Sequence, residues 1–466
     1  MESIMTLEQV AKACDGILCF CDKERLVKDV VTDSRKVCDG SVFVALRGEK
    51  FDGHNFVAQV YEEGAICSIV NEDFQNPGEA PVIVVKDTYS ALRSIAAYYR
   101  SLFSAPSIAI TGSVGKTSTK DMIASVLSEH YKILKTEGNF NNEIGLPLTA
   151  FRMEKDDELA VFEMGMSAFG EISRLSKIAA PETAVITNIG YSHIEHLGSR
   201  ENILKAKLEV LDGMLPSGTV ILNGDDDLLK DVLGNLPFET LSYGISNKAA
   251  DIVAYNIKKF SDGTEFEVKI NGDEHKFKIN VPGEHHVYNA LAAILLGIMY
   301  NIPTEEIEEG IKNFKPSGMR QDITRLKDIV IIKDCYNASP TSMKSGLEVL
   351  SVTEPNDKET PHRLVAVLGD MLELGDYAHE AHKEVGGLCS GYDLGCLIAV
   401  GQNAKFVAEG AIEKGFNSSE LYVFYDNTTA MEHILEILKP NDIVLFKGSR
   451  GMRLEEIADF VAKNNI

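Results

Sequence analysis

Residues 108–119, with the sequence IAITGSVGKTST, constrain the fold of this chain more than any other stretch. A β-branched run ends in a turn bounded by two glycines, and a Lys-Thr pair then opens a helical pattern with apolar residues on one face. Glycines let the backbone curl so that several N–H groups converge, and the helix N-terminus adds partial positive charge at the same point. The stretch therefore predicts a strand, a phosphate-binding turn and a helix in succession.

The turn is a variant of the P-loop. The general pattern places a glycine six residues before the lysine, where this chain has Ile110, and its first glycine is Gly112. A glycine-rich turn without a ligand is the alternative, but strand, turn, Lys-Thr and helix all appear in order. We expect Lys116 to neutralise terminal phosphate oxygens and the Thr117 hydroxyl to be a ligand of the Mg²⁺ that accompanies ATP.

Length and charge limit the classes of protein. A chain of 466 residues predicts about three domains, and a net charge of -24 argues against a surface for nucleic acid or anionic membranes. No signal peptide is visible, and the longest apolar run, 290–300, is far shorter than the ~20 residues that span a bilayer. The eight cysteines include no C-x-x-C pair, which favours thiols over a metal site. We expect a cytoplasmic protein.

The chain divides into three α/β regions. Residues 1–103 hold short strands and a closing helix, and 104–315 alternate strand and helix, which predicts a parallel sheet covered on both faces. Within it, 252–281 alternate polar and apolar residues, as appended antiparallel strands do. Residues 316–466 predict a Rossmann-like sheet without the G-x-G-x-x-G fingerprint. The expected strands are 41–46, 67–70, 82–85, 159–162, 184–187, 220–222, 329–332, 364–368, 397–400, 422–425 and 443–446, and the expected helices include 89–100, 287–300 and 304–313.

Several polar residues follow expected strands of the central region. Glu163 has the position of the acid that holds magnesium in P-loop ATPases, although an ordinary acid at a helix start is the alternative. His193 is a second candidate ligand at the same sheet edge, where a lone histidine is more often structural. Asn139, Asn141 and Asn142 form a polar loop cluster that could equally cap the backbone.

Further polar residues gather at the carboxyl ends of the expected strands in the last region, where open α/β sheets bind ligands. They are Asp334, Tyr336, Asn337, Asp370, Glu373, Lys447 and Arg450.

Five motifs together resemble the Mur ligases, the ATP-dependent amino-acid ligases of peptidoglycan precursor synthesis: TGSVGKTS, EMG, TNIGYSHIEHLGS, YNALAA and DCYNASPTS. Two more, DSR at 33–35 and DGHNF at 52–56, resemble the family's uridine-nucleotide domain. Within the family, NFNNEIGLP, GDMLELG and KGSRGMRLEE resemble the member that adds D-alanyl-D-alanine. The order of these motifs through all three regions makes the resemblance highly specific.

The resemblance implies a ligase that joins D-alanyl-D-alanine to a UDP-N-acetylmuramoyl tripeptide. A carboxylate is a poor electrophile, so ATP would first convert it to an acyl phosphate, which the dipeptide amine then attacks. The protein would chiefly position the reactants and offset charge. We expect a monomer that binds no nucleic acid and does not insert into membranes.

The resemblance also assigns roles to residues. The ATP phosphates would meet Gly112, Ser113, Val114, Gly115, Lys116, Thr117 and Ser118. Asn289 would lie on the adenine side, and the last region would complete the nucleotide site with Arg320, Asp334, Tyr336 and Asn337. One Mg²⁺ would be held by Thr117 and Glu163, and a second by His193 with Lys207, where relatives carry a carbamylated lysine. A carbamate is a carboxylate and can bind a metal, whereas a free ammonium would repel it.

Substrate contacts follow from the same resemblance. Ser34 and Arg35 would contact the uridine diphosphate, and Asn139 and Asn142 would line the peptide and γ-phosphate region. Lys447 and Arg450 are candidates for the dipeptide or substrate carboxylates, with a solvated face as the alternative.

Two departures from the family pattern stand out. Histidine occupies position 286, where relatives commonly have asparagine, which leaves the role of His286 open. Arg320 comes one residue later than in a plain Gly-Arg pattern. Two other functions compete: the family's ligase for the third-position diamino acid, whose Asp-Asn-Pro-Arg-type motif is absent here, and a nucleotide-dependent switch that hydrolyses ATP without ligation.

Overall fold

The computed structural model describes residues 1–76 and 78–464. The chain forms two compact units. The first comprises Met1–Thr111, Tyr131–Val185 and Ala206–Val220, and the second comprises Gly112–His130, Ile186–Lys205 and Ile221–Ile466.

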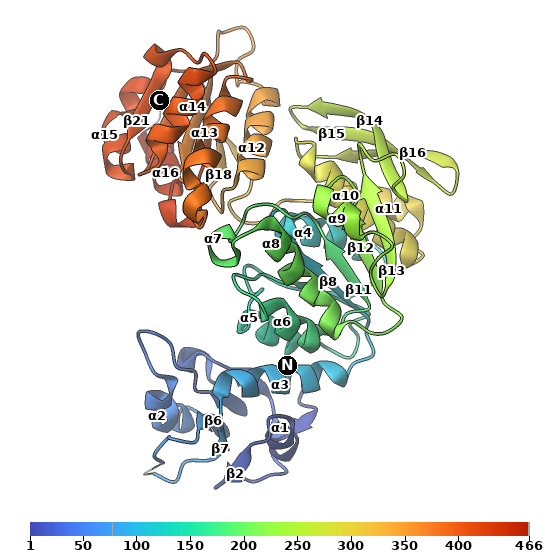
Figure 1. Cartoon of the computed structure of the whole chain (residues 1–466). Helices are drawn as coiled ribbons and strands as arrows, with labels where there is room; N and C mark the ends of the chain where they lie inside the picture. Colours follow the sequence, from blue (N-terminus) through green and yellow to red (C-terminus); the bar gives the residue numbers. More distant parts are fainter. Residues whose placement is uncertain (77, 465–466) are drawn as a thin grey trace. The chain divides into compact units, whose positions relative to one another are not determined.

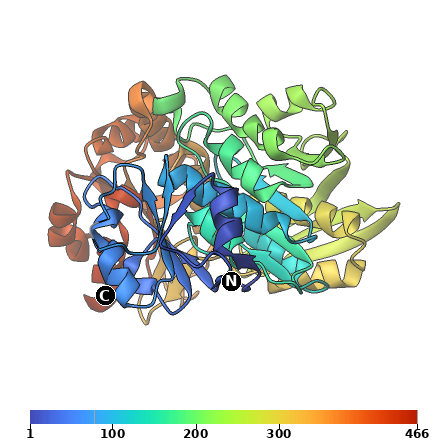
Figure 2. The ribbon, with the colours of Figure 1, turned by 90° about the horizontal axis from the view of Figure 1, so that it is seen from below.

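The N-terminal sheet has five strands in the order β2-β7-β6-β5-β4. Its strands are β2 (Ile17–Cys19), β4 (Asp29–Val31), β5 (Ser41–Val44), β6 (Cys67–Asn71) and β7 (Val82–Val85), which Figure 2 shows side by side in blue. Only β2 pairs antiparallel. The other N-terminal elements are β1 (Met5–Thr6), α1 (Leu7–Ala13), β3 (Leu26–Val27), η1 (Ser34–Lys36), η2 (Gly53–Phe56), α2 (Val57–Glu62) and α3 (Thr88–Ser101). The predicted strands at 41–46, 67–70 and 82–85 and the helix at 89–100 are confirmed, whereas β1 to β4 were not predicted.

The central sheet has nine strands in the order β16-β15-β14-β13-β12-β11-β8-β10-β9. They are β8 (Ser107–Thr111), β9 (Ile133–Lys135), β10 (Leu159–Glu163), β11 (Thr183–Ile186), β12 (Thr219–Asn223), β13 (Glu239–Gly244), β14 (Ile252–Phe260), β15 (Gly263–Ile270) and β16 (Asp273–Ile279). Every residue of β8, β10, β11 and β12 is buried, as expected for parallel strands covered on both faces. The last three strands pair antiparallel, which confirms the appended strands predicted over 252–281.

The helices that accompany this sheet are α4 (Lys116–Leu127), α5 (Gly145–Ala150), α6 (Glu171–Ala179), α7 (Ile194–Leu197), α8 (Arg200–Leu208), η3 (Glu209–Gly213), α9 (Asp227–Val232), α10 (His285–Met299) and α11 (Thr304–Asn313). The long apolar run at 290–300 covers the second half of α10 and its C-cap residue, and residues 290–297 of it are buried. The run is therefore a core helix. Among the residues described, no helix combines the length and apolarity needed to cross a bilayer.

The C-terminal sheet has six strands in the order β17-β18-β22-β19-β20-β21, coloured orange to red in Figure 1. They are β17 (Asp322–Arg325), β18 (Val330–Asp334), β19 (Leu364–Gly369), β20 (Leu394–Val400), β21 (Leu421–Phe424) and β22 (Ile443–Lys447). Each strand from β18 onward is followed by a helix: α12 (Pro340–Val352), η4 (Gly375–Tyr377) with α13 (Ala378–Cys389), α14 (Ala404–Glu413), α15 (Asn427–Ile437), and η6 (Arg450–Met452) with α16 (Glu455–Asn464); η5 (Ser418–Glu420) precedes β21. The alternation predicted for this region is confirmed, and β17 adds an antiparallel edge strand that was not predicted.

The segment between α3 and β8 is fastened by a buried arginine. Arg100, 7% exposed, donates hydrogen bonds to the carbonyls of Phe103 (2.9 Å), Ala105 (2.8 Å) and Ala179 (3.2 Å) and to the Ser107 hydroxyl (2.9 Å). Its pKa is lowered by burial. The boundary predicted between residues 103 and 104 falls in this segment, whose backbone is held by the side-chain hydrogen bonds of Arg100.

Candidate functional site

The succession of strand, glycine-bounded turn and helix forms as predicted, with the turn between β8 and α4. Gly112 has φ +150°, and a Cβ there would lie 1.9 Å from the Thr187 hydroxyl oxygen, so only glycine fits. Gly115 precedes the first residue of α4 with φ +83°. The first N–H groups of a helix have no acceptor within it and point outward from its N-terminus. The turn is therefore a cradle shaped by backbone and closed to side chains, which fits a phosphate.

Two residues that the sequence analysis did not select fix this turn. Asn188 holds Val114 from both sides, accepting from its N–H at 2.9 Å and donating to its carbonyl at 2.9 Å. Its own carbonyl accepts the N–H of Ser113 at 3.0 Å. The Thr187 hydroxyl donates to the same Val114 carbonyl at 2.7 Å. Within the described part of the chain the buried Ser113 hydroxyl has no hydrogen-bond partner, so the turn retains a polar group that a ligand can engage.

Lys116 and Thr117 begin α4, as predicted. The Lys116 ammonium donates to the carbonyl of Gly112 at 2.8 Å, so it lies against the turn that it is expected to serve. The buried Thr117 hydroxyl accepts from Arg320 at 3.0 Å, and the Arg320 guanidinium lies over the Tyr336 ring at 3.8 Å from its centre. The second unit thus brings together four of the predicted nucleotide residues.

A buried carboxylate ends β10 in the first unit. Glu163 is 1% exposed and stands opposite Ile110 of β8 in the parallel pairing. The Asn141 side chain donates to Oε1 of Glu163 at 2.7 Å, and the backbone N–H of Glu163 donates to the Thr136 hydroxyl at 3.0 Å. An oriented carboxylate oxygen is a ligand that Mg²⁺ accepts, as is the hydroxyl of Thr117. The donor chemistry of the two predicted ligands of the first ion therefore fits the metal.

The asparagine cluster divides into different roles. The Asn142 side chain accepts the N–H of Ile144 (3.1 Å) and Gly145 (2.8 Å), at the start of α5. Asn139 is exposed and contributes its carbonyl to a 2.8 Å bond with the N–H of Asn141. Asn141, to which the sequence assigned no role beyond membership of the cluster, is the asparagine that contacts Glu163.

The residues expected at the second metal ion lie in different units. His193 has φ +65°, and its Nδ1 pairs with a carboxylate oxygen of Glu373 at 2.6 Å. Lys207, on α8, is 1% exposed. Among residues 1–76 and 78–464, no group of three or more His, Cys, Asp or Glu side chains is arranged to hold a metal.

Hydrogen bonds of residues on α10 show what His286, whose role the sequence left open, contacts. The Asn289 side chain accepts from the Thr119 hydroxyl at 2.8 Å, and His286 Nε2 lies 2.8 Å from the side-chain oxygen of Gln321. The Gln321 amide nitrogen in turn lies 2.9 Å from His285 Nε2. Burial lowers the pKa of His286 to about 4 and lowers the pKa of His285 well below its usual value, so both rings are neutral near pH 7. His286 therefore holds the residue that follows Arg320.

The candidates in the C-terminal sheet separate by burial. Lys447 at the end of β22 is 2% exposed and forms an ion pair with Asp334, its register partner at the end of β18. Arg450 is exposed and pairs with Glu455 at 2.7 Å. Asn337 is exposed, and its carbonyl lies 3.4 Å from the Lys447 ammonium. Lys447 thus has a buried structural partner, which the sequence analysis did not anticipate.

The DSR turn is local, with Asp33 and Ser34 half-buried and Arg35 exposed. Ser34 opens η1, and the Arg35 guanidinium bonds Asp33 at 2.9 and 2.8 Å. This bonding lowers the pKa of Asp33 to about 2. Arg35 retains the exposure that a bound diphosphate would require.

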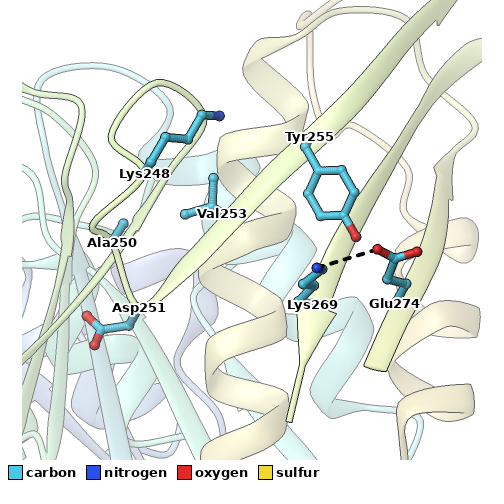
Figure 3. A pocket seen from close by; sticks show the side chains of 7 residues that line it. All are labelled: Lys248, Ala250, Asp251, Val253, Tyr255, Lys269 and Glu274. Carbon is cyan, nitrogen blue, oxygen red and sulfur yellow. Dashed lines mark ion pairs between the residues drawn. The ribbon is translucent and has the colours of Figure 1, made fainter. Parts of the chain in front are cut away.

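A further pocket lies on the antiparallel strands and the loop before them (Figure 3). Lys269 and Glu274, joined by the dashed line in Figure 3, form an ion pair at 3.6 Å. The pocket is lined by Lys248, Ala250, Asp251, Val253, Tyr255, Lys269 and Glu274. None of these residues was predicted to bind a ligand, and the lining contains no glycine turn at a helix start.

Comparisons with known proteins agree with this arrangement. Residues 110–297 match the family model described as the Mur ligase middle domain, 319–450 match the Mur ligase glutamate ligase domain, and 27–100 match the Mur ligase family catalytic domain. A UDP-N-acetylmuramoyl-tripeptide–D-alanyl-D-alanine ligase from Bacillus subtilis (strain 168) is 40% identical, with 97% of each chain covered.

Two solved structures are similar along nearly the whole chain. A crystal structure of MurF from Acinetobacter baumannii has a TM-score of 0.89 at 32% identity and covers 98% of this chain and 99% of its own. The MurF ligase from Thermotoga maritima in complex with ADP has a TM-score of 0.82 at 27% identity, covering 94% of this chain and 97% of its own.

Proposed function

The chain belongs to the Mur ligase family, and we propose that its central sheet activates a carboxylate with ATP through the residues described above. It is an ATP-dependent ligase that joins D-alanyl-D-alanine to the carboxylate of a UDP-N-acetylmuramoyl tripeptide and so forms the pentapeptide precursor of peptidoglycan. The observation that carries the phosphoryl-transfer step is the glycine cradle at 112–115 with Lys116 lying against it.

The chemistry explains why a nucleotide is needed. A carboxylate resists attack by an amine because oxide is a poor leaving group. Transfer of the γ-phosphoryl group to a carboxylate oxygen gives an acyl phosphate, whose leaving group is phosphate. The dipeptide amine attacks the carbonyl carbon, and the tetrahedral intermediate collapses to an amide and inorganic phosphate. The protein positions the reactants and offsets charge in these steps.

Each residue has a part in binding. The cradle and the N-terminus of α4 receive the phosphates, and Lys116 supplies a positive charge beside them. Arg320 orients the Thr117 hydroxyl and adds a second positive charge, while Tyr336 holds its guanidinium plane. Mg²⁺, when bound, neutralises phosphate charge, and Thr117 and Glu163 supply the oxygen ligands that would hold it.

The remaining assignments rest on the family pattern. Residues 1–103, 104–315 and 316–466 form the domains for the uridine nucleotide, ATP and the incoming dipeptide. His193 and a carbamylated Lys207 hold a second Mg²⁺. We place the protein in the cytoplasm, where ATP is available, and as a monomer, which sedimentation measurements would check.

The central test is to measure phosphate release with each substrate omitted in turn. A ligase requires both the nucleotide-linked tripeptide and D-alanyl-D-alanine, whereas release indifferent to the dipeptide would indicate a nucleotide-dependent switch. The third-position ligase would instead release phosphate when the two substrates are replaced by a nucleotide-linked dipeptide and a free diamino acid. Tripeptides carrying lysine or diaminopimelate at position three, tested in parallel, identify the accepted substrate.

Isotope transfer tests the acyl phosphate. When the carboxyl oxygens of the tripeptide are ¹⁸O, one labelled oxygen should appear in the released phosphate, and its absence would exclude this step. Lys116→Ala should lower turnover by at least about 10³-fold, on the scale of a lost charge at a phosphoryl-transfer site. Lys177→Ala, which removes an exposed lysine on α6, is the matched control and should leave turnover unchanged. Partial rescue of Lys207→Ala by short carboxylates would support the carbamate.

A further inference from the structure

Two cysteine sulfurs meet in the N-terminal sheet, which contains none of the residues assigned to catalysis. The Sγ atoms of Cys21 and Cys67 lie 3.5 Å apart, although the residues are 46 positions apart in the chain. Cys67 opens β6, which lies between β5 and β7, and is 1% exposed. Cys21 follows the edge strand β2 and is half-buried; β2, β6 and β7 are labelled together in Figure 1. One sulfur is thus fixed inside the sheet, and the other lies at its accessible margin.

The backbone before Cys21 turns its thiol inward. Phe20 has φ +59°, a conformation that bulky residues rarely adopt, and its side chain is 60% exposed. The Cys21 thiol lies 3.2 Å from the carbonyl oxygen of Cys19 and 3.5 Å from that of Val82. The turn therefore leaves an aromatic ring in solvent while it keeps the thiol beside Cys67.

We propose that Cys21 and Cys67 are a reversible disulfide site, in which Cys21 meets the oxidant and Cys67 resolves the oxidised sulfur. Bond formation requires the sulfurs to approach from 3.5 Å to about 2.05 Å, which is a side-chain movement of about 1.5 Å. A metal site is not the alternative, since the described residues contain no cluster of three or more suitable ligands.

The pKa values of the two thiols are shifted in opposite directions, as expected if Cys21 reacts first and Cys67 resolves the oxidised sulfur. The hydrogen bond with Cys67 lowers the pKa of Cys21, which favours the nucleophilic thiolate, whereas burial raises the pKa of Cys67. Cys14, which also belongs to this domain, has its pKa raised to about 11 by burial and donates to the carbonyl of Val10 at 3.2 Å. Cys14 is therefore poorly suited to begin the reaction.

The reaction balances with a peroxide as oxidant. The Cys21 sulfur attacks one peroxide oxygen, the O–O bond breaks, and the departing oxygen takes the thiol proton and leaves as water, giving a sulfenic acid. The Cys67 sulfur then attacks the Cys21 sulfur, the S–O bond breaks, and the hydroxyl leaves with the Cys67 proton as a second water. The net change is two thiols and one hydrogen peroxide to one disulfide and two waters.

The test uses the full-length protein. It is treated with hydrogen peroxide, its remaining thiols are alkylated, and peptides are mapped by mass spectrometry without reduction. We expect the Cys21 and Cys67 peptides to be joined, with two hydrogens fewer than their sum, and to separate after dithiothreitol. The proposal is overturned if both Cys21 and Cys67 are still reduced, and are therefore found alkylated, after a peroxide dose that oxidises the exposed Cys38. It is also overturned if Cys14 replaces either residue in the joined peptides.

Three variants assign the individual steps. In Cys67→Ser, the Cys21 sulfenic acid has no resolving thiol and should accumulate as an adduct with a 1,3-diketone probe. In Cys21→Ser, Cys67 should remain reduced because it is buried. Cys38→Ser, the matched control, should form the cross-link to the same extent as the unmodified sequence. An adduct in Cys67→Ser no greater than in the unmodified protein would refute the assigned order.

Discussion

The ion pair of Lys447 and Asp334 allows a quantitative choice between a structural and a substrate-binding lysine. The Lys447 side chain is 2% exposed and that of Asp334 is 12% exposed, and the two residues face each other across β22 and β18. The stem of Lys447 also packs against Gly346 of α12, where a Cβ would lie 2.9 Å from its Cδ. Removing one charge would leave the other buried without its partner.

We therefore expect Lys447→Met to lower the free energy of unfolding of the C-terminal domain by about 3–5 kcal/mol. Asp334→Asn should cost a similar amount for the same reason. The double variant should lose less than the sum of the two, with a coupling of about 1–3 kcal/mol, because no uncompensated charge remains.

Urea unfolding of the three variants and the unmodified protein closes this thermodynamic cycle. Arg450→Gln is the control, because Arg450 makes an exposed pair with Glu455 whose loss should change stability by at most about 1 kcal/mol. Additive single-variant losses, or a Lys447→Met protein of normal stability with a raised KM for D-alanyl-D-alanine, would refute the structural role and restore the substrate role.

Three further outcomes follow from the site. Gly112→Ala should cost about 1–3 kcal/mol of stability through its backbone conformation alone and lower ADP formation, and adding Thr187→Ala should relieve only the steric part; normal activity of the single variant would contradict the cradle. Asn141→Ala should lower kcat by about tenfold, the equivalent of one hydrogen bond, while the exposed Asn139→Ala does not, and equal effects would remove the distinction. Burial lowers the pKa of His286 to about 4, so as pH falls the unfolded chain binds a proton at this histidine before the folded protein does. The neutral ring therefore contributes up to about 3 kcal/mol to the free energy of unfolding, and this contribution is complete above pH 6.5 and is lost as pH falls toward 4. His286→Asn should therefore flatten that part of the urea-midpoint profile, and parallel profiles would contradict the buried neutral ring.

The elements that the sequence predicts well are those whose pattern is local. The change from a β-branched run to a helical period predicts β8 and α4, and alternating polarity predicts β14 to β16. Strands β1 to β4 have two or three residues each, too few to establish a period. β1 pairs with β3 and β2 with β7, so two of these pairings also join strands that are not neighbours in the sequence.

The site shows the same limit at the level of side chains. The sequence identifies Lys116 and Thr117 because the turn that positions them is contiguous. It does not identify Asn188, since its bonds to Val114 join residues 74 positions apart. It also selects Asp334 and Lys447 alike as ligands, because both end strands at one sheet edge, and it does not reveal that each neutralises the other.

The buried Arg100 bears on how this protein can be divided. A fragment that starts at residue 104, the boundary predicted from the sequence, would lack the Arg100 guanidinium. That group donates hydrogen bonds to the carbonyls of Ala105 and Ala179 and to the hydroxyl of Ser107. Ser107 begins β8, the strand that leads into the glycine turn, Ala105 lies two residues before it, and Ala179 ends α6. An isolated ATP-binding piece should therefore begin before α3, and lengthening 101–106 should be far less tolerated than lengthening an ordinary surface loop.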